Sequence, residues 1–130
     1  MLYAILCYHD EDFTGSWTKE QDAAVMKKLA LVQDKLKKQG RLGPVARLLP
    51  TTSATTLRKD DPPVVLDGPY AETKEQLLGF YLVDCGNLDE AVDVARDLSA
   101  ANPGGAYEIR PVGLFTPGEL AKEPARELKT

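Results

Sequence analysis

The chain has 130 residues, 43% of them hydrophobic and 28% charged, which is typical of a single globular domain that needs no disulfides for stability. Its net charge of -4 and isoelectric point near 5.0 argue against nucleic acid and anionic membranes as partners, because both require a basic protein surface. Cys7 and Cys85 lie far apart without metal-ligand spacing, so we expect free thiols in a reducing cytoplasm.

The first predicted element is a strand over residues 2–8, with apolar side chains on both faces, and we therefore expect both faces to be covered. The stretch is too short to span a bilayer and has no basic segment before it, so we do not interpret it as a signal. An acidic loop is expected over residues 9–17.

A helix is predicted to begin after this loop, because Thr18 and Gln21 match the S/T-x-x-E/Q capping box. Gly40 is expected to end the helix in the C′ position, after a last turn rich in lysine. The apolar residues at helical spacing are Val25, Leu29, Val32 and Leu36.

A short strand over residues 45–49 is predicted next, ended by Pro50. Residues 54–58 and 63–66 then predict a hairpin with an exposed tip at residues 59–62, inserted into a simpler core.

The segment from Asp67 to Glu75 is the most informative stretch of the chain. Asp67-Gly68-Pro69 is a strong turn sequence and ends the preceding strand. The apolar run over residues 77–83 predicts another strand, in which Gly79 indicates a bulge or a close approach of two backbones. The result is a polar loop held between strands, where binding residues are often found.

A second helix is predicted after Asn87, which is a good N-cap and is followed three residues later by Glu90. Its expected apolar face consists of Leu88, Ala91, Val92, Ala95 and Leu98. Residues 102–105 break this helix, and residues 106–114 alternate as a strand with one apolar and one charged face. We expect a domain over residues 1–115 and a tail over residues 116–130, with a short helix near residues 119–123.

This order of elements is the split βαβ pattern of an α+β, ferredoxin-like fold, with both helices on one face of an antiparallel sheet. The other face is left uncovered in a single chain. If two such sheets meet across that face, the cavity between them is the natural ligand site.

The run Asp67-Gly68-Pro69-Tyr70, with the following residues 71–77 and Gly79-Phe80-Tyr81, resembles the DGPF branch of the YCII-related family, with Tyr70 where Phe is usual. The resemblance extends through residues 53–56 and 108–112. It implies a ferredoxin-like unit related to the dimeric α/β-barrel proteins, and a homodimer. Other branches carry a histidine in the first helix as part of an active site. This chain has no histidine between Thr18 and Gly40, which argues against carrying over a histidine-based mechanism.

The candidate catalytic residues are Asp67 and Glu72, with Tyr70 and Lys74 as ligand-binding residues of the same loop. Among these residues, the resemblance favours a functional role most for Asp67 and Glu72. The alternative is structural: Asp67 hydrogen-bonds its own turn while the other charges are solvated, or residues 72–78 form a helical turn.

Arg47 and Arg110 are the other candidates for ligand binding, because a guanidinium group binds carboxylate or phosphate in a bidentate manner. Arg110 is equally suited to a cross-strand ion pair with Glu108. Tyr81 is a candidate for the floor of a pocket, with core packing as the alternative.

His9 is the only histidine and lies in an acidic context, so a general base or partial metal site competes with a surface histidine at a strand end. Cys7, inside an apolar strand, is interpreted as an inert thiol. No Walker, GxGxxG, GxSxG or HExxH motif is present, and we expect no metal and no cofactor.

Two functions follow from this pattern. The first is a cytoplasmic homodimer that binds a small polar or aromatic metabolite at the sheet face, with acid–base catalysis by Asp67 and Glu72. The second is a non-catalytic interaction or regulatory module that binds another protein through residues 67–75 and the tail.

Overall fold

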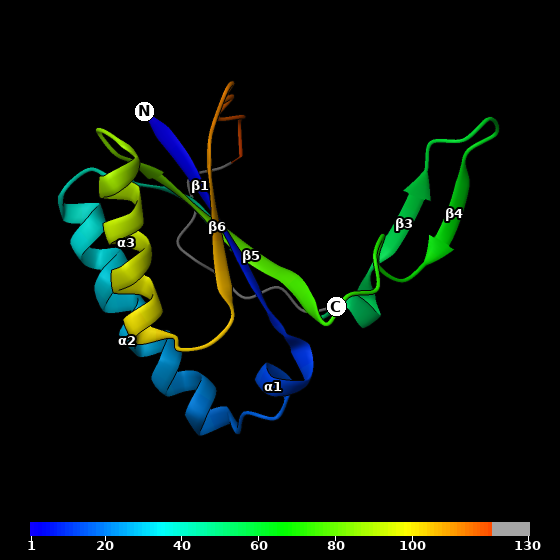
Figure 1. Ribbon diagram of the computed structural model, residues 1–130, viewed down its shortest axis with the longest axis horizontal. Helices are drawn as coiled ribbons and strands as arrows, with labels where there is room; N and C mark the ends of the chain where they lie inside the picture. Colours follow the sequence, from blue (N-terminus) through cyan, green and yellow to red (C-terminus); the bar gives the residue numbers. More distant parts are fainter. Residues whose placement is uncertain (121–130) are drawn as a thin grey trace.

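The computed structural model describes residues 1–120, which form a four-stranded sheet, two long helices and a separate hairpin (Figure 1). The elements are β1 (Leu2–Asp10), α1 (Glu11–Gly15), α2 (Lys19–Lys38), β2 (Leu42–Arg47), the short 3-10 helix η1 (Thr51–Ser53), β3 (Thr55–Arg58), β4 (Val64–Asp67), β5 (Glu75–Asp84), α3 (Leu88–Ala101) and β6 (Ala106–Pro111). The sheet has the order β2-β5-β1-β6 with antiparallel neighbours throughout. This confirms the predicted α+β, ferredoxin-like split βαβ fold.

The strand β1 lies in the centre of the sheet and continues two residues beyond the predicted end, to Asp10. The acidic loop expected over residues 9–17 is wrong, since most of it is the helix α1. Asp10 is the reason: its carboxylate accepts the N–H of Asp12 at 2.9 Å and so caps the first turn.

The capping box predicted for α2 is confirmed. Thr18 Oγ1 accepts the N–H of Gln21 at 3.0 Å, and Gln21 Oε1 accepts the N–H of Thr18 at 2.9 Å. Leu29 and Leu36 are buried as the spacing predicts. Gly40 follows the helix with φ of 68°, a conformation that favours glycine.

The edge strand β2 begins at Leu42, three residues before the predicted start, and ends at Arg47. Gly43 and Pro44 weaken the strand pattern at the start of β2, because both residue types are unfavourable within strands. Pro44 is tolerated because β2 is an edge strand in the described sheet, paired there with β5 alone, and the register with β5 shifts between Leu42 and Val45.

The predicted role of Gly79 in β5 is confirmed, because a side chain there would overlap the carbonyl oxygen of Ala46 on β2. The pairing of β1 with β5 also has a bulge between Cys7 and Tyr8, opposite Gly79 and Leu77.

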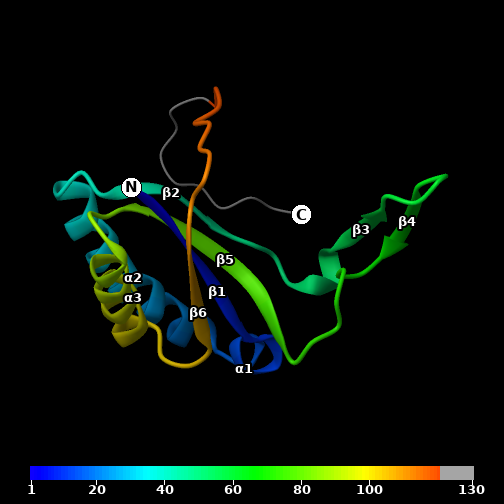
Figure 2. The same ribbon diagram turned by 45° about the horizontal axis from the view of Figure 1, so that its top comes forward.

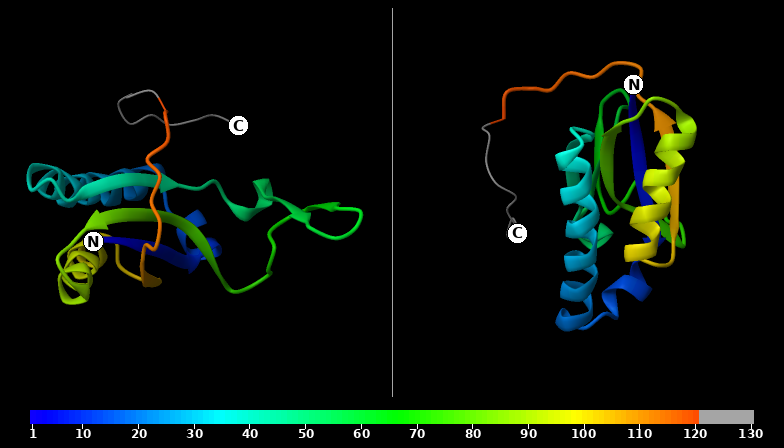
Figure 3. Two further views of the ribbon diagram at one scale, coloured as in Figure 1. Left: turned by 90° about the horizontal axis from the view of Figure 1, so that it is seen from above. Right: turned by 90° about the vertical axis from the view of Figure 1, so that its left-hand side faces the viewer.

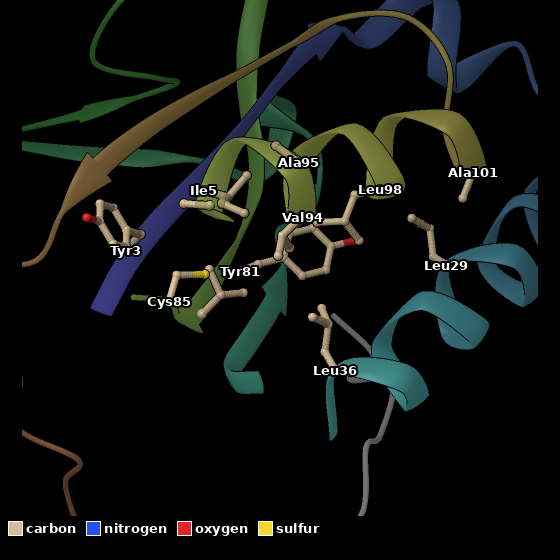
Figure 4. Packing of buried hydrophobic residues seen from close by; sticks show 12 residues of the cluster. Tyr3, Ile5, Leu29, Leu36, Tyr81, Cys85, Val94, Ala95, Leu98 and Ala101 are labelled. Carbon is tan, nitrogen blue, oxygen red and sulfur yellow. The ribbon is translucent and has the colours of Figure 1, made fainter. Parts of the chain in front are cut away.

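The core lies between the sheet and the helices α2 and α3, which pack side by side on one face (Figure 3). Ile5, Val83 and Leu98 are completely buried in it. Figure 4 shows Tyr81, Leu98 and Val94 meeting between the two layers. The predicted face of α3 is corrected at two positions: Val94 is buried, whereas Leu88 is 52% exposed, because the contact with α2 rotates the buried stripe.

The opposite face of the sheet carries no helix in the described part of the chain, and we call it the open face. The expectation that both faces of β1 are covered is therefore not met within residues 1–120. The open face consists of Leu2, Ala4, Leu6 and Tyr8 of β1, Ala46 of β2, Phe80 and Leu82 of β5, and Glu108 and Arg110 of β6.

The predicted hairpin is confirmed as β3 and β4, which pair with each other and with no further strand of the described chain. With its flanking residues we call it the arm, residues 54–68. It extends away from the sheet on the side opposite α2 and α3 (Figure 2). Residues 112–120 form no helix or strand, and the rest of the helix predicted near 119–123 lies outside the described residues.

Candidate functional site

The loop singled out by the sequence, residues 67–75, connects β4 to β5 at the base of the arm, and we call it the DGPY loop. Gly68 has φ of 104°, donates its N–H to the oxygen of Ala54 at 2.8 Å and accepts a hydrogen bond from Thr56 Oγ1 at 2.8 Å. The prediction of a polar loop held between two strands is thus confirmed.

The charged side chains of the DGPY loop are exposed to solvent. Within residues 1–120, no hydrogen bond or ion pair is made by the side chains of Asp67, Glu72 or Lys74. The helical turn considered for residues 72–78 is wrong, because β5 begins at Glu75. Residues 1–120 therefore leave both candidate carboxylates without a partner, rather than grouped with the other candidates.

Tyr70 is 79% exposed, and its ring lies 5.9 Å from the guanidinium carbon of Arg58 on β3. Leu57, Lys59 and Asp60 complete a shallow hollow of about 260 Å³ on the arm. Tyr70 and Arg58 are brought together here, but no other predicted site residue lines the hollow.

Arg47 and Tyr81 lie on the helix side of the sheet. The guanidinium of Arg47 binds the carboxylate of Asp22 on α2, with Nη2 to Oδ1 at 3.0 Å and Nη1 to Oδ2 at 3.4 Å. Tyr81 is only 7% exposed and belongs to the core, as the packing alternative predicts. An incoming anion would have to compete with Asp22 for Arg47.

Arg110 lies on the open face, opposite Ala4 in the register of β6 with β1. The predicted ion pair with Glu108 is not formed, and Glu108 instead accepts a hydrogen bond from Tyr8 Oη at 3.5 Å. Among the described residues Arg110 has no anionic partner. It is therefore available to a ligand or to a second chain.

Three weakly acidic side chains, Cys7, Tyr81 and Tyr107, lie beneath the helices on adjacent strands. Burial raises the pKa of Cys7 to about 12, and burial together with the nearby Cys7 raises the pKa of Tyr81 to about 12. The pKa of Tyr107 is also raised, chiefly by burial. This supports the interpretation of Cys7 as an inert thiol, and both cysteines are free as expected.

His9 is not the surface histidine that the strand end suggested. Its ring stacks on Phe13 with centroids 4.9 Å apart, and a side chain at Gly104 would lie 2.7 Å from Nε2. Both ring nitrogens are buried, and neither has a hydrogen-bond partner within residues 1–120. Sequence spacing gave no signal for this packing, because Phe13 belongs to the unpredicted helix α1 and Gly104 follows α3.

Glu11 is a residue whose role the sequence did not reveal. Its carboxylate accepts hydrogen bonds from the N–H of Thr51, at 2.8 Å, and from Thr51 Oγ1. These bonds attach η1, at the base of the arm, to α1. Asp10 caps the helix α1 locally, whereas nothing in the sequence around Glu11 indicates its partner Thr51, 40 residues further along the chain.

A second hollow of about 230 Å³ lies between α2 and α3 and contains none of the predicted site residues. Lys35 and Arg41 face Glu90, Asp93 and Asp97 there, so the hollow holds charges of both signs. No group of three or more potential metal-binding side chains is found within residues 1–120, and no helix in that range is long and apolar enough to cross a membrane.

Comparison with known proteins places this fold in a family. The YCII-related domain matches residues 1–116. The chain is also similar to an uncharacterized protein of Rhizobium meliloti (strain 1021), with 62% identity over 122 residues that cover 92% of this chain and 98% of that protein. Together with the split βαβ topology, these matches show that the chain belongs to the YCII-related family.

Proposed function

We propose that this YCII-related protein is a homodimer in which two open faces pack together, and that it binds a small aromatic or polar carboxylate in the cavity between them. The observation that carries the proposal is the open face, a half-buried apolar sheet surface that no helix of residues 1–120 covers, with an arginine at its margin that has no anionic partner in that range.

The apolar centre of the open face favours a protein partner. Ala4, Leu6, Phe80 and Leu82 form two adjacent cross-strand pairs in the middle of the sheet, and Ala46 extends this surface onto β2. Contiguous apolar surface of this kind on a globular protein marks interaction or ligand sites. A face-to-face pairing about a two-fold axis covers both copies at once.

Arg110 favours an anionic ligand, and the neighbouring side chains favour an aromatic one. The guanidinium has no carboxylate partner in the described chain, whereas Arg47 is already bound to Asp22. Tyr8 and Phe80 lie on the same face and supply ring surfaces. A ligand with an aromatic ring and a carboxylate matches both features.

Asp67 and Glu72 supply acid–base chemistry in this proposal, with Tyr70 and Lys74 of the same loop as binding residues. The side chains of Asp67, Glu72 and Lys74 make no hydrogen bond or ion pair among residues 1–120, so they are available to a ligand or a second chain. Tyr81 does not contact the ligand in this proposal, since it is buried on the helix side of β5, beneath the open face. The free cysteines accord with a cytoplasmic location, which is part of the same proposal.

A thermal-shift screen against small aromatic carboxylates tests the ligand, because a compound that binds only the native protein raises the melting temperature by mass action. We expect hits that Arg110→Ala removes and that the matched variant Arg47→Ala retains. If Arg47→Ala removes the hits and Arg110→Ala retains them, the site lies on the helix side and the proposal is wrong.

Catalysis is tested with a compound from that screen. We expect Asp67→Asn to bind the compound as the wild type does but to lose its conversion, followed by liquid chromatography of the mixture. Unchanged conversion by Asp67→Asn and Glu72→Gln would remove both residues from the catalytic role.

The alternative function, a module that binds another protein without catalysis, is favoured by one observation, the exposed apolar side chains of the arm. Wild-type protein that is a monomer and yields no small-molecule hit would favour this alternative.

A further inference from the structure

The arm consists of strands that are exposed on both faces. Every residue of β3 and β4 except Thr56 is exposed, and the apolar ones include Leu57 at 57% and Val65 at 66%. Within residues 1–120 the two strands pair with each other and with no other strand. An isolated two-stranded hairpin is at best marginally stable in water, so this arm requires a surface to pack on.

The base of the arm is nevertheless fixed to the rest of the chain. The carboxylate of Glu11 binds the backbone and hydroxyl of Thr51, and the N–H of Leu48 donates to the oxygen of Leu78 at 2.8 Å. The two ends of the arm are joined to each other, because the N–H of Gly68 donates to the oxygen of Ala54 at 2.8 Å. The direction of the arm is thus set by hydrogen bonds at its base rather than by packing along its length.

That direction places the arm on the same side of the sheet as the open face. In Figure 1 the helices α2 and α3 lie to the left of the strands and the arm extends to their right, and in the left-hand view of Figure 3 the arm again lies at the end of the strands away from the helices. Exposed apolar residues also follow the end of β2 toward the arm, at Leu48 and Leu49. A molecule packed on the open face therefore lies beside the arm.

The exposed area of the chain agrees with a missing partner. The accessible surface is 9893 Å², whereas a monomeric protein of 14.2 kDa exposes about 6800 Å². Residues 121–130 contribute at most about 1600 Å² even if fully extended. An excess of about 1500 Å² remains, within the roughly 800 to 2500 Å² that each partner of a stable dimer buries.

We infer that the arm packs against a second copy of this chain and completes that copy's ligand site with its DGPY loop. The inference rests on the proposed homodimer and deepens it, because it makes the site composite. A second copy is the partner that fits, since each chain has both an uncovered sheet face and an unsupported arm, and a two-fold axis matches one to the other.

Charge supports the same pairing. The DGPY loop carries three exposed carboxylates, Asp67, Glu72 and Glu75, against one ammonium group, Lys74. On the open face, Glu108 already accepts a hydrogen bond from Tyr8, while Arg110 has no anionic partner among the described residues. Within one chain the loop and Arg110 make no ion pair among the described residues. In the clasped dimer the loop of one copy lies at the margin of the open face of the other, so the acidic groups and the arginine of one site come from two chains.

The test measures the dimer dissociation constant by sedimentation equilibrium for the wild type and three variants. The arm variant Leu57→Ser/Val65→Ser removes two apolar side chains from the arm, and Lys59→Ala at its tip is the matched control. Phe80→Glu places a charge on the open face. We expect the arm variant to raise the dissociation constant about a hundredfold, because two apolar contacts are lost, with Lys59→Ala unchanged.

The outcomes separate this inference from the proposed function. A wild-type dimer that Phe80→Glu dissociates and the arm variant leaves intact would overturn the clasping arm and keep the sheet-to-sheet dimer. The opposite result would keep the arm and overturn the sheet pairing. If the wild-type protein is still monomeric about 100-fold above the concentrations used for the other measurements, its dissociation constant is weaker than roughly 1 mM. That result would overturn both the clasping arm and the sheet-to-sheet dimer.

Folding of the arm variant is checked by circular dichroism, and a second measurement does not depend on substitutions. Hydrogen exchange of the backbone amides of β3 and β4 is followed while wild-type protein is diluted through the dissociation constant. We expect protection of these amides in the dimer and its loss in the monomer. Equal exchange at both concentrations contradicts the inference.

Discussion

The sheet with its two helices and the arm are built from similar local signals but differ in what supports them. Ile5 and Val83 on β1 and β5 have no exposed surface, whereas Leu57 and Val65 on β3 and β4 are more than half exposed. All four residues lie in antiparallel ladders. The difference teaches that local sequence specifies the ladder, while the surface that stabilises it is found within the chain in one case and outside it in the other.

The largest effect is expected from the same substitution in the two regions. Leu98→Ala removes a completely buried side chain and is expected to lower the free energy of unfolding by about 2 to 5 kcal/mol. Leu57→Ala is expected to change it by less than about 0.5 kcal/mol. Both are measured by urea denaturation in a Phe80→Glu background, which prevents the proposed dimer. Similar losses at the two positions would show that the arm is packed within its own chain.

A smaller effect is expected from substituting two glycines that differ in the room available for a side chain. Gly79→Ala places a methyl group against the Ala46 carbonyl and is expected to cost about 1 to 3 kcal/mol, because β2 must move. Gly15→Ala, with no atom within 4 Å of the added group, is the control and is expected to be neutral or slightly stabilising. Thermal denaturation compares them. If Gly79→Ala is as stable as Gly15→Ala, β2 and β5 are not held as closely as described.

At the junction of the two regions, Glu11→Ala removes the acceptor of two hydrogen bonds from Thr51. The expected loss is about 1 kcal/mol, since the site is only partly buried. The distinguishing result is faster proteolysis of the arm while the sheet remains resistant. Asp12→Ala, a neighbouring carboxylate that is exposed, is the control. Equal proteolysis of both variants would mean that Glu11 does not fix the arm.

The smallest effect is expected from Cys7, which lies between the sheet and its helices and changes the stability of the protein only at alkaline pH. The pKa of Cys7 is raised from 9.0 to about 12, so the unfolded chain loses this proton at lower pH than the folded chain. Its contribution to stability is complete below about pH 9 and is lost as pH rises toward 12. We expect Cys7→Ala to flatten the decrease of melting temperature between pH 9 and 11. An unchanged slope would assign the alkaline instability to other groups such as Tyr81.

Signals that act over a few residues predicted the fold well. Thr18 and Gln21 marked the start of α2, Gly40 marked its end, and Asp67-Gly68 marked the end of β4, because caps and turns satisfy backbone groups nearby. Leu42 was missed because Gly43 and Pro44 weaken a strand signal. Its place in β2 depends on pairing with Val83, about 40 residues away.

The candidate site was less accessible to prediction, because its residues depend on contacts between elements. The DGPY loop was located correctly between two strands, yet Arg47 is paired with Asp22 and Tyr81 is in the core. No spacing in the sequence indicates these partners. Arg110 was singled out by its strand, and only the sheet order β5-β1-β6 places it beside an uncovered apolar surface.

Sedimentation equilibrium of the wild-type protein is the most direct test of the central claim, that the open face is covered by a second copy. We expect a mass of about 28 kDa, twice the 14.2 kDa of the chain, that falls to the single-chain mass on dilution or in Phe80→Glu. A constant single-chain mass at millimolar concentration would contradict the claim, because an interface of standard size binds far more tightly than that.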